Sequence, residues 1–258
     1  MGCMWPAATS IFFLYAALAS WVRPGVRGAT RLRVTLLAAA GASGSFAAAS
    51  LPSGILRTWL LPPVVLLIAY WTSGLLFVEP MPRVEALLLR VDRTLRVPQI
   101  VRRTPPWLAI ALELAYAGVY PLIPIALAVH LAVAVAPDAE RFWTVVLVTD
   151  FICFGMLPWI QTRPPRALEP RPPWCSSLRR FNVRMLGETS IGVNTVPSGH
   201  AAEAFAAALL VSNASGPVEG AMWLAAVAVS AGAVLGRYHF AVDAIAGWGV
   251  ALLVWITL

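Results

Sequence analysis

Long apolar segments recur along the whole chain, and they limit the folds open to it more than any other feature. A helix of roughly 17–25 apolar residues can cross a bilayer with its backbone hydrogen bonds satisfied within the segment. The candidate segments lie at 5–22, 34–50, 56–78, 107–136, 142–160, 197–212, 218–235 and 239–258. Because 59% of the residues are hydrophobic and only 12% are charged, a soluble domain is excluded. The sequence therefore predicts an all-α fold, a multi-pass transmembrane helical bundle.

The eight segments divide into two parts. We expect residues 1–54 to form two N-terminal membrane helices and residues 55–258 to form a core of six. Pro121 and Pro124 lie inside the fourth segment. A kink is expected there, because a proline removes one backbone hydrogen bond of a helix.

Two connections between the segments are long. In 79–106, apolar residues such as Val84, Leu88 and Val91 recur at helical spacing between charged ones. This pattern indicates an amphipathic helix lying in the membrane interface, with an ordinary solvated loop as the alternative. The second connection, 161–196, is rich in proline and arginine and is expected to be a loop.

Basic residues are concentrated on one side of the predicted bundle. All 19 are arginines, and the formal net charge is +7. If the helices alternate in direction, 17 arginines lie at one membrane face and only Arg57 and Arg141 at the other. The positive-inside rule then makes the arginine-rich face cytoplasmic, in what we expect to be a bacterial cell membrane. Nucleic acid is not expected as a partner, because no basic face forms on a soluble domain.

The three cysteines give no sign of a disulfide framework or a metal centre. Cys153 lies inside an apolar segment, Cys3 is at the terminus, and Cys175 alone lies in a long loop. With no metal-ligand spacing in the chain, neither a metal nor a cofactor is expected.

The string Pro197-Ser198-Gly199-His200 is typical of an anion site at a helix start. Proline suits the first position of a helix, and Thr195 or Asn194 is a possible cap. The free N–H groups of Ser198, Gly199 and His200 would then face an anion, and Gly199 would let it approach the backbone closely. A helix start that carries a polar interfacial histidine is the alternative.

A second histidine, His239, lies four residues before Asp243 at the start of the last apolar segment. This spacing puts both on one helix face, where the carboxylate can fix the imidazole tautomer and leave the other nitrogen basic. Two such histidines can divide one phosphoryl transfer between them, one as nucleophile and one as acid. Arg163 and Arg166 supply fixed positive charge for the phosphate. A purely structural His–Asp pair is the alternative.

Together the two histidine strings resemble the type 2 phosphatidic acid phosphatase superfamily, whose motifs read in outline K-x6-R-P, P-S-G-H and S-R-x5-H-x3-D. The second motif is complete at 197–200, and the third keeps its histidine and aspartate. The resemblance implies that His239 is the phosphate-accepting nucleophile held by Asp243, and that His200 protonates the leaving oxygen. It also implies that Arg163 binds the phosphate together with Ser198 and Gly199.

The chain departs from these motifs at two places. Met156 stands where the first motif has its lysine, and Gly232-Ala233 stand where the third has Ser-Arg. Arg237 is one helical turn from position 233, so we expect it to present its guanidinium to nearly the same place. The missing lysine could be replaced by Arg166 or by another arginine of 161–196. The pattern is closest to the branch that contains inositol phosphorylceramide synthases.

Other ionisable residues lie within the apolar segments. His130 and Asp150 are expected at similar depth in consecutive helices, where they could form a structural pair or serve substrate or proton transfer. Glu203 lies three residues after His200 and could tune it or make an unrelated polar contact.

The sequence therefore predicts an integral membrane lipid phosphate phosphatase that works through a phosphohistidine. Its expected partners are a membrane lipid phosphate and the lipid bilayer. A lipid phosphotransferase, in which an alcohol replaces water, and a catalytically degenerate membrane scaffold are the alternatives. Met156 and Ala233 favour the scaffold.

Overall fold

The computed structural model describes residues 4–133, 137–212, 214 and 216–258, and within them the regular structure is helical apart from one isolated bridge between Thr162 and Asn194. The helices are α1 (Met4–Val22), α2 (Gly28–Ala49), the π-helical turn η1 (Leu56–Leu60), α3 (Leu61–Gly74), α4 (Pro82–Thr94), α5 (Val97–Arg103), α6 (Pro106–Ala117), α7 (Val119–Val133), α8 (Ala139–Gly155), α9 (Pro165–Leu168), α10 (Ser177–Thr189), α11 (Gly199–Leu210), α12 (Gly216–Leu235) and α13 (Ala241–Thr257). This confirms the predicted all-α bundle.

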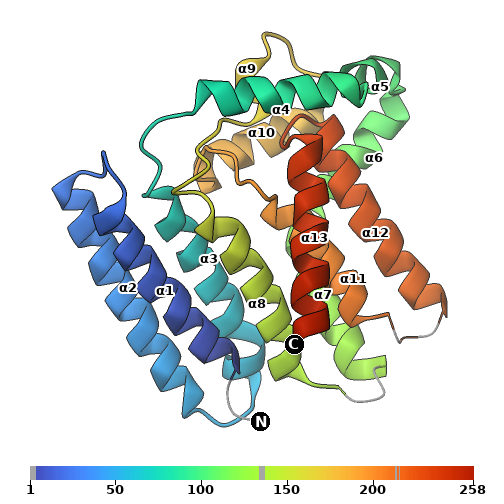
Figure 1. Cartoon of the computed structure of the whole chain (residues 1–258). Coiled ribbons are helices and arrows are strands. Elements are labelled where there is room, and N and C mark those ends of the chain that lie inside the picture. Colours follow the sequence, from blue (N-terminus) through green and yellow to red (C-terminus); the bar gives the residue numbers. More distant parts are fainter. Residues whose placement is uncertain (1–3, 134–136, 213, 215) are drawn as a thin grey trace.

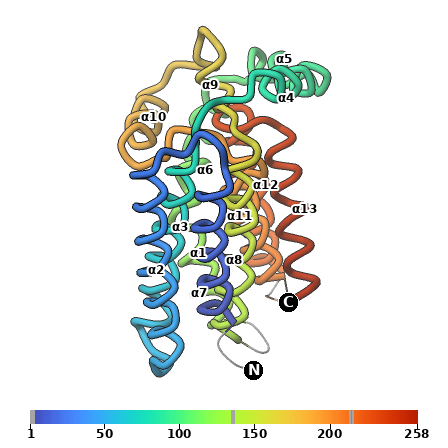
Figure 2. Tube along the Cα trace, turned by 60° about the vertical axis from the view of Figure 1, so that its left-hand side comes forward, coloured from blue at the N-terminus to red at the C-terminus, as the bar shows by residue number. Residues whose placement is uncertain are grey.

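Most of the helices run side by side as a bundle, and α4, α5, α9 and α10 lie across one end of it (Figures 1 and 2). We call α4, α5, α9 and α10 together the cap. By length and apolarity, α1, α2 and α12 can each cross a membrane, and α6 with α7 can do so as a bent pair. The remaining bundle helices are shorter, and α11 lies at the centre, packed against α7, α8, α12 and α13.

The predicted kink in the fourth apolar segment is confirmed, and it is sharp enough to divide the segment into two helices. The axes of α6 and α7 differ by 62°, with the break at Gly118. Pro121 explains the position, because it has no N–H to donate to the carbonyl group four residues earlier. The helix resumes when the N–H of Leu122 donates to the carbonyl of Gly118. Residues 134–136, at the end of the predicted segment, lie outside the described residues.

The sixth segment differs from its prediction. The helix α11 begins after Ser198, whose hydroxyl caps it by accepting the N–H of Ala201, and not at Pro197 with a cap from Thr195 or Asn194. Its 12 residues span about 18 Å, which is shorter than the hydrocarbon core. The Ala-rich sequence lets neighbouring helices approach it closely, so it is a buried central helix.

The two long connections fold into the cap. Residues 79–106 contain the amphipathic helix α4 and the short α5, and Leu88 of α4 packs with Val196 and Phe240 beneath it. The connection 161–196 is not simply a loop, because α9 and α10 form within it. Ser176 was the available signal for α10, since its hydroxyl caps that helix by accepting the N–H of Arg179.

Close packing of α11 against α13 depends on Gly247. A methyl group added there would lie 2.6 Å from the carbonyl oxygen of Ser198, whereas one added at Gly249 would meet no atom within 4 Å. We therefore expect Gly247→Ala to lower the free energy of unfolding by about 1–3 kcal/mol through overpacking. Gly249→Ala, the matched control, should leave it unchanged or raise it. Thermal unfolding in detergent measures both, and equal stability of the two variants would contradict this packing.

Candidate active site

The structure brings the two predicted histidines together. His200 is the second residue of α11, and His239 directly precedes Phe240, the N-cap of α13. Their ring centroids lie 6.2 Å apart although the residues are far apart in sequence. The rings approach each other because α11 and α13 pack side by side in the same direction, with both N-termini near the cap (Figure 1).

Asp243 lies beside His239, but not on one helix face with it as the spacing predicted, because His239 precedes Phe240, the N-cap of α13. One carboxylate oxygen, Oδ2, accepts the backbone N–H of Phe240 and the amide of Asn194, each at 2.9 Å. The same oxygen lies 3.5 Å from Nδ1 of His239. The two fixed donors hold the carboxylate where it can orient the imidazole and leave Nε2 free. Asn194 was considered in the sequence only as a helix cap.

The start of α11 is joined to the start of α13. The N–H of Ser198 donates to the backbone carbonyl of Asp243, and its hydroxyl is used by Ala201, so Ser198 has no free N–H for an anion. Gly199 and His200 supply the first two N–H groups of α11, where such groups have no partner within a helix. Of Ser198 and Gly199, both predicted to bind the phosphate, only Gly199 therefore offers it a backbone N–H.

A small polar cavity of about 30 Å³ lies between the two imidazoles. Gly199, His200, His239 and Arg166 all line it. Arg166 lies in α9. Its backbone N–H donates to the backbone carbonyl of Arg237, and its guanidinium lies 5.4 Å from the centre of the Tyr238 ring, so both its backbone and its side chain are held in place. Of the three arginines predicted to bind phosphate, Arg166 is the one that lines this cavity.

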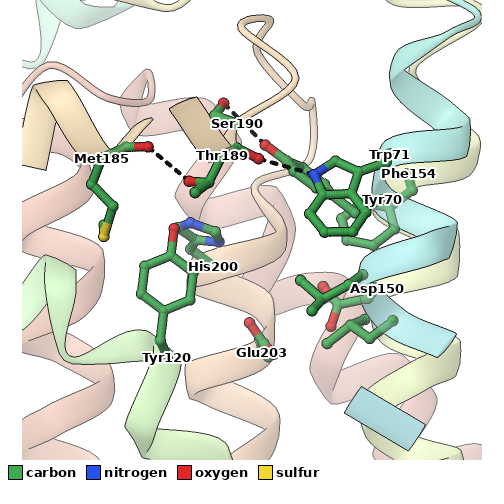
Figure 3. A pocket seen from close by; sticks show the side chains of 12 residues that line it. Tyr70, Trp71, Tyr120, Asp150, Phe154, Met185, Thr189, Ser190, His200 and Glu203 are labelled. Carbon is green, nitrogen blue, oxygen red and sulfur yellow. Dashed lines mark hydrogen bonds between the residues drawn. The ribbon is translucent and has the colours of Figure 1, made fainter. Parts of the chain in front are cut away.

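A larger cavity of about 410 Å³ adjoins the first one, and Figure 3 shows it. His200 lines both cavities. We call the small one the polar cavity and the large one the apolar cavity. The apolar cavity is lined by Leu66, Leu67, Tyr70, Trp71, Tyr120, Asp150, Phe154, Met185, Thr189, Ser190, His200 and Glu203. Trp71 and Tyr120 keep 48% and 46% of their surface exposed, so the cavity opens on the side of the bundle.

Comparison with known families agrees with this geometry, because residues 85–257 match the PAP2 superfamily. The chain belongs to that superfamily. Searches among curated proteins and among solved structures gave no significant match. The matched region contains both histidines, Asp243 and the helices that position them. It also contains the two positions at which the chain lacks basic residues of the superfamily motifs.

Arg163, at the first superfamily motif, is not brought to the polar cavity. Its guanidinium pairs with both carboxylate oxygens of Glu85 in α4, at 3.0 and 2.8 Å. Its backbone N–H donates to the same carboxylate. These hydrogen bonds lower the pKa of Glu85 below its usual value. Arg163 therefore joins the connection 161–196 to the cap helix α4.

Arg237, predicted to replace the missing arginine of the third motif, is likewise engaged elsewhere. It adopts a left-handed backbone conformation with φ of 61°, and it is 1% exposed. Its guanidinium contacts Asp92 of α4 and Glu169, each at 2.7 Å. Burial acts to lower the pKa of Arg237, but the hydrogen bonds to Glu169 and Asp92 outweigh it, and the pKa is raised. The left-handed turn directs the side chain into the cap, away from the polar cavity.

Residues 236–240, the loop that carries His239, are also held by Glu113 of α6, an acidic residue that sequence reasoning missed. Glu113 accepts hydrogen bonds from the hydroxyl of Tyr238, from Arg179 and from Asn182. Arg179 also donates to the carbonyl of Gly236, at 2.9 Å. The loop that carries His239 is thus tied to α6 and α10 as well as to α4. An acidic residue inside an apolar segment was the available signal.

The predicted pairing of His130 with Asp150 is not found. His130 Nδ1 lies 2.9 Å from the carbonyl oxygen of Leu210, and its Nε2 accepts the N–H of Asp138, so the backbone occupies both ring nitrogens. Asp150 instead faces the apolar cavity, together with Glu203 (Figure 3). The N–H of Asp138, the N-cap of α8, lies within hydrogen-bond distance of His130 and takes the ring nitrogen that pairing with Asp150 would need.

The buried pair between Arg237 and Asp92 gives a testable prediction on stability. Arg237→Met should lower the free energy of unfolding by about 3–5 kcal/mol, because Asp92 would be left charged, buried and unpaired. Asp92→Asn in that background should recover part of the loss. Arg93→Met, at an exposed neighbouring position, is the control and should change it by less than about 0.5 kcal/mol. A small effect of Arg237→Met in chemical unfolding would refute the pairing.

Proposed function

We propose that this chain is an integral membrane phosphatase that removes phosphate from a membrane lipid through a phosphohistidine on His239. The observation that carries the proposal is the pair of imidazoles, 6.2 Å apart, on one small cavity that also holds Arg166 and the start of α11. A reacting phosphorus about 3–3.5 Å from one ring leaves its bridging oxygen within about 2.6–3.2 Å of the other. Membership of the PAP2 superfamily supports a phosphatase.

In the first step, Nε2 of His239 attacks phosphorus and the bond from phosphorus to the lipid oxygen breaks. Asp243, 3.5 Å from Nδ1, stabilises the positive imidazole as this bond forms. His200 donates its proton to the departing lipid oxygen. In the second step, His200 takes a proton from water, the water oxygen attacks phosphorus, and the bond to His239 breaks. The products are inorganic phosphate and a lipid alcohol.

Negative charge on the phosphoryl oxygens is balanced by fixed groups of the chain. The N–H groups of Gly199 and His200 lie at the positive end of the α11 dipole. Arg166 supplies a planar guanidinium, which matches phosphate oxygens in pairs. Because these groups are held before substrate binds, they need no rearrangement as charge develops. No step of this mechanism asks for a metal ion.

A lipid is the favoured substrate because the polar cavity adjoins the apolar one. A phosphate at His200 and His239 can extend its apolar part past Phe154 and Leu66, toward the side opening at Trp71. Superfamily membership and the apolar helices support a membrane location for the reaction. Product analysis distinguishes the phosphatase from a lipid phosphotransferase, since free phosphate forms only when water is the acceptor. A scaffold without activity would release none.

The proposed nucleophile is tested by trapping the intermediate. Incubation with a lipid phosphate carrying labelled phosphorus should leave acid-labile, base-stable label on the wild-type protein. His239→Ala should carry no label and lose turnover. His200→Ala should reduce turnover by about 10²–10⁴-fold, the usual contribution of one general acid and base. Normal turnover in either variant would rule out the assignment.

Arg166 has a matched control in the same connection. Arg166→Ala should lower kcat/KM by about 10²–10³-fold, the usual effect of losing one donor to a developing anion. Arg166→Lys should restore only part, because an ammonium lacks the planar pair of donors. Arg171→Ala, at an exposed position nearby, should leave the rate unchanged. Equal rates for Arg166→Ala and Arg171→Ala would exclude Arg166 from the phosphate site.

We further propose that the active site faces the cytoplasm. The 17 arginines assigned to one face belong to the segments 23–33, 79–106, 161–196 and 237, and the other end carries Arg57 and Arg141. In Figure 1 the cap covers the end of the bundle at which α11 and α13 begin. The positive-inside rule supports cytoplasmic placement of that end. Cys175 is exposed there and offers a natural label site.

Orientation is tested with a membrane-impermeant thiol reagent in intact cells. In a variant with Cys3→Ser and Cys153→Ala, we expect Cys175 to stay unlabelled until the membrane is permeabilised. Cys175→Ser in the same background is the control for background labelling. Rapid labelling of Cys175 in intact cells would place the active site outside.

A further inference from the structure

Two acidic side chains in the wall of the apolar cavity have no part in the mechanism above. Asp150 comes from α8 and Glu203 from α11, and Figure 3 shows both in the wall of the cavity that His200 also lines. Asp150 is 1% exposed, and its Oδ2 has no hydrogen-bond partner among the described residues. An unpartnered buried oxygen in a residue that lines a cavity calls for an explanation, and a ligand group in that cavity supplies one.

The carboxylate of Asp150 lies directly beside the proposed phosphate site. A methyl group added to Gly199 would lie only 3.0 Å from Oδ1 of Asp150. Gly199 also lines the polar cavity between the two histidines. A ligand group that contacts Asp150 is therefore separated from the phosphorus by only a few bonds.

No fixed positive charge among the described residues that line the cavity balances these acids when they are ionised. None of the described residues that line the apolar cavity is Lys or Arg, and its one basic member is His200. Ionisable groups at membrane depth are costly unless they are paired, and they commonly mark substrate or ion sites. When ionised, two carboxyl groups beside an anion site would in addition repel the phosphate. A positive charge on the ligand, between the phosphate and the acids, removes both costs.

We propose that the apolar cavity selects a lipid phosphate that carries an ammonium group within a few bonds of its phosphate ester, with Asp150 and Glu203 as the specificity-determining residues. The ammonium donates to the free oxygen of Asp150, and Glu203 adds a second acceptor. The alkyl chain lies along Leu66, Leu67 and Phe154 and leaves through the side opening at Trp71. The cavity volume of about 410 Å³ lies within the range of small-molecule sites. This inference rests on the proposed function, which puts the phosphate between His200 and His239.

The experiment uses three phosphate monoesters with the same alkyl chain. The carbon next to the ester carbon carries an ammonium, a hydroxyl or a hydrogen. Phosphate release is measured for the wild-type protein, Asp150→Asn, Glu203→Gln and Glu188→Gln in detergent. Glu188 is the matched control, because it is an exposed acid on α10 beside the lining residue Thr189. Thermal unfolding shows that each variant is folded.

We expect the wild-type protein to favour the ammonium substrate over the hydrogen one by at least about 10-fold in kcat/KM, since a hydrogen bond between charged groups is stronger than one between neutral groups. That ratio should fall by about 10-fold in Asp150→Asn and by less in Glu203→Gln, and it should not change in Glu188→Gln. A wild-type ratio near one, a preference for the hydroxyl substrate, or an unchanged ratio in both variants would overturn the proposal. If a variant does not fold, the wild-type ratio decides.

Binding separates this inference from the proposed function. If no substrate releases phosphate, the proposed function fails, and the inference is then decided by affinity alone. His239→Ala protein should bind the ammonium lipid at least about 10-fold more tightly than the hydrogen one, and Asp150→Asn in that background should remove the difference. Equal affinities would overturn the inference.

Discussion

The active site depends on one junction, at which the starts of α11 and α13 are hydrogen-bonded to each other. The backbone carbonyl of Asp243 accepts a hydrogen bond from the N–H of Ser198. Its carboxylate accepts hydrogen bonds from the backbone N–H of Phe240 and the side-chain amide of Asn194. The distance between the two histidines is therefore set by backbone and not by mobile side chains. Gly247 permits the helices to come this close, because any side chain there would meet the carbonyl of Ser198. Catalysis by positioning needs such rigidity.

The arginines of this chain divide between structure and chemistry according to the acids they meet. Arg163, Arg179 and Arg237 each pair with a carboxylate. The Arg163 pair joins the connection 161–196 to α4, the Arg179 pair joins α10 to α6, and the Arg237 pair joins the loop of His239 to α4. Buried pairs of this kind add little net stability, but breaking one is costly, so they fix one arrangement of the cap. Arg166 differs because its guanidinium lies against the Tyr238 ring and its charge is left for the polar cavity.

The elements and residues that could be predicted from the sequence are those marked by neighbouring residues in the chain. Segment lengths gave α1, α2, α12 and α13, and short motifs gave His200, His239 and Asp243. The partners of the arginines could not be found in this way. Arg237 meets Asp92 across 145 residues, and only folding brings them together. A left-handed turn at Arg237 also reverses the direction that helical spacing from position 233 implies. The sequence overestimates the length of α11, because it predicts Pro197 as the first residue and Val211 continues the apolar run past Leu210.

Pro121 illustrates how a break in regular structure shapes the site. It ends α6 near Gly118, so Tyr116 and Tyr120 lie on either side of a 62° bend. Both rings nevertheless contact His200, with centroids 5.5 and 5.7 Å from it. Tyr116 lines the polar cavity and Tyr120 the apolar one. In a straight helix, residues four apart stack along one face and would line a single wall. The bend thus lets one helical segment help form two adjoining cavities of different polarity around one histidine, which is what a phosphate joined to an alkyl chain requires.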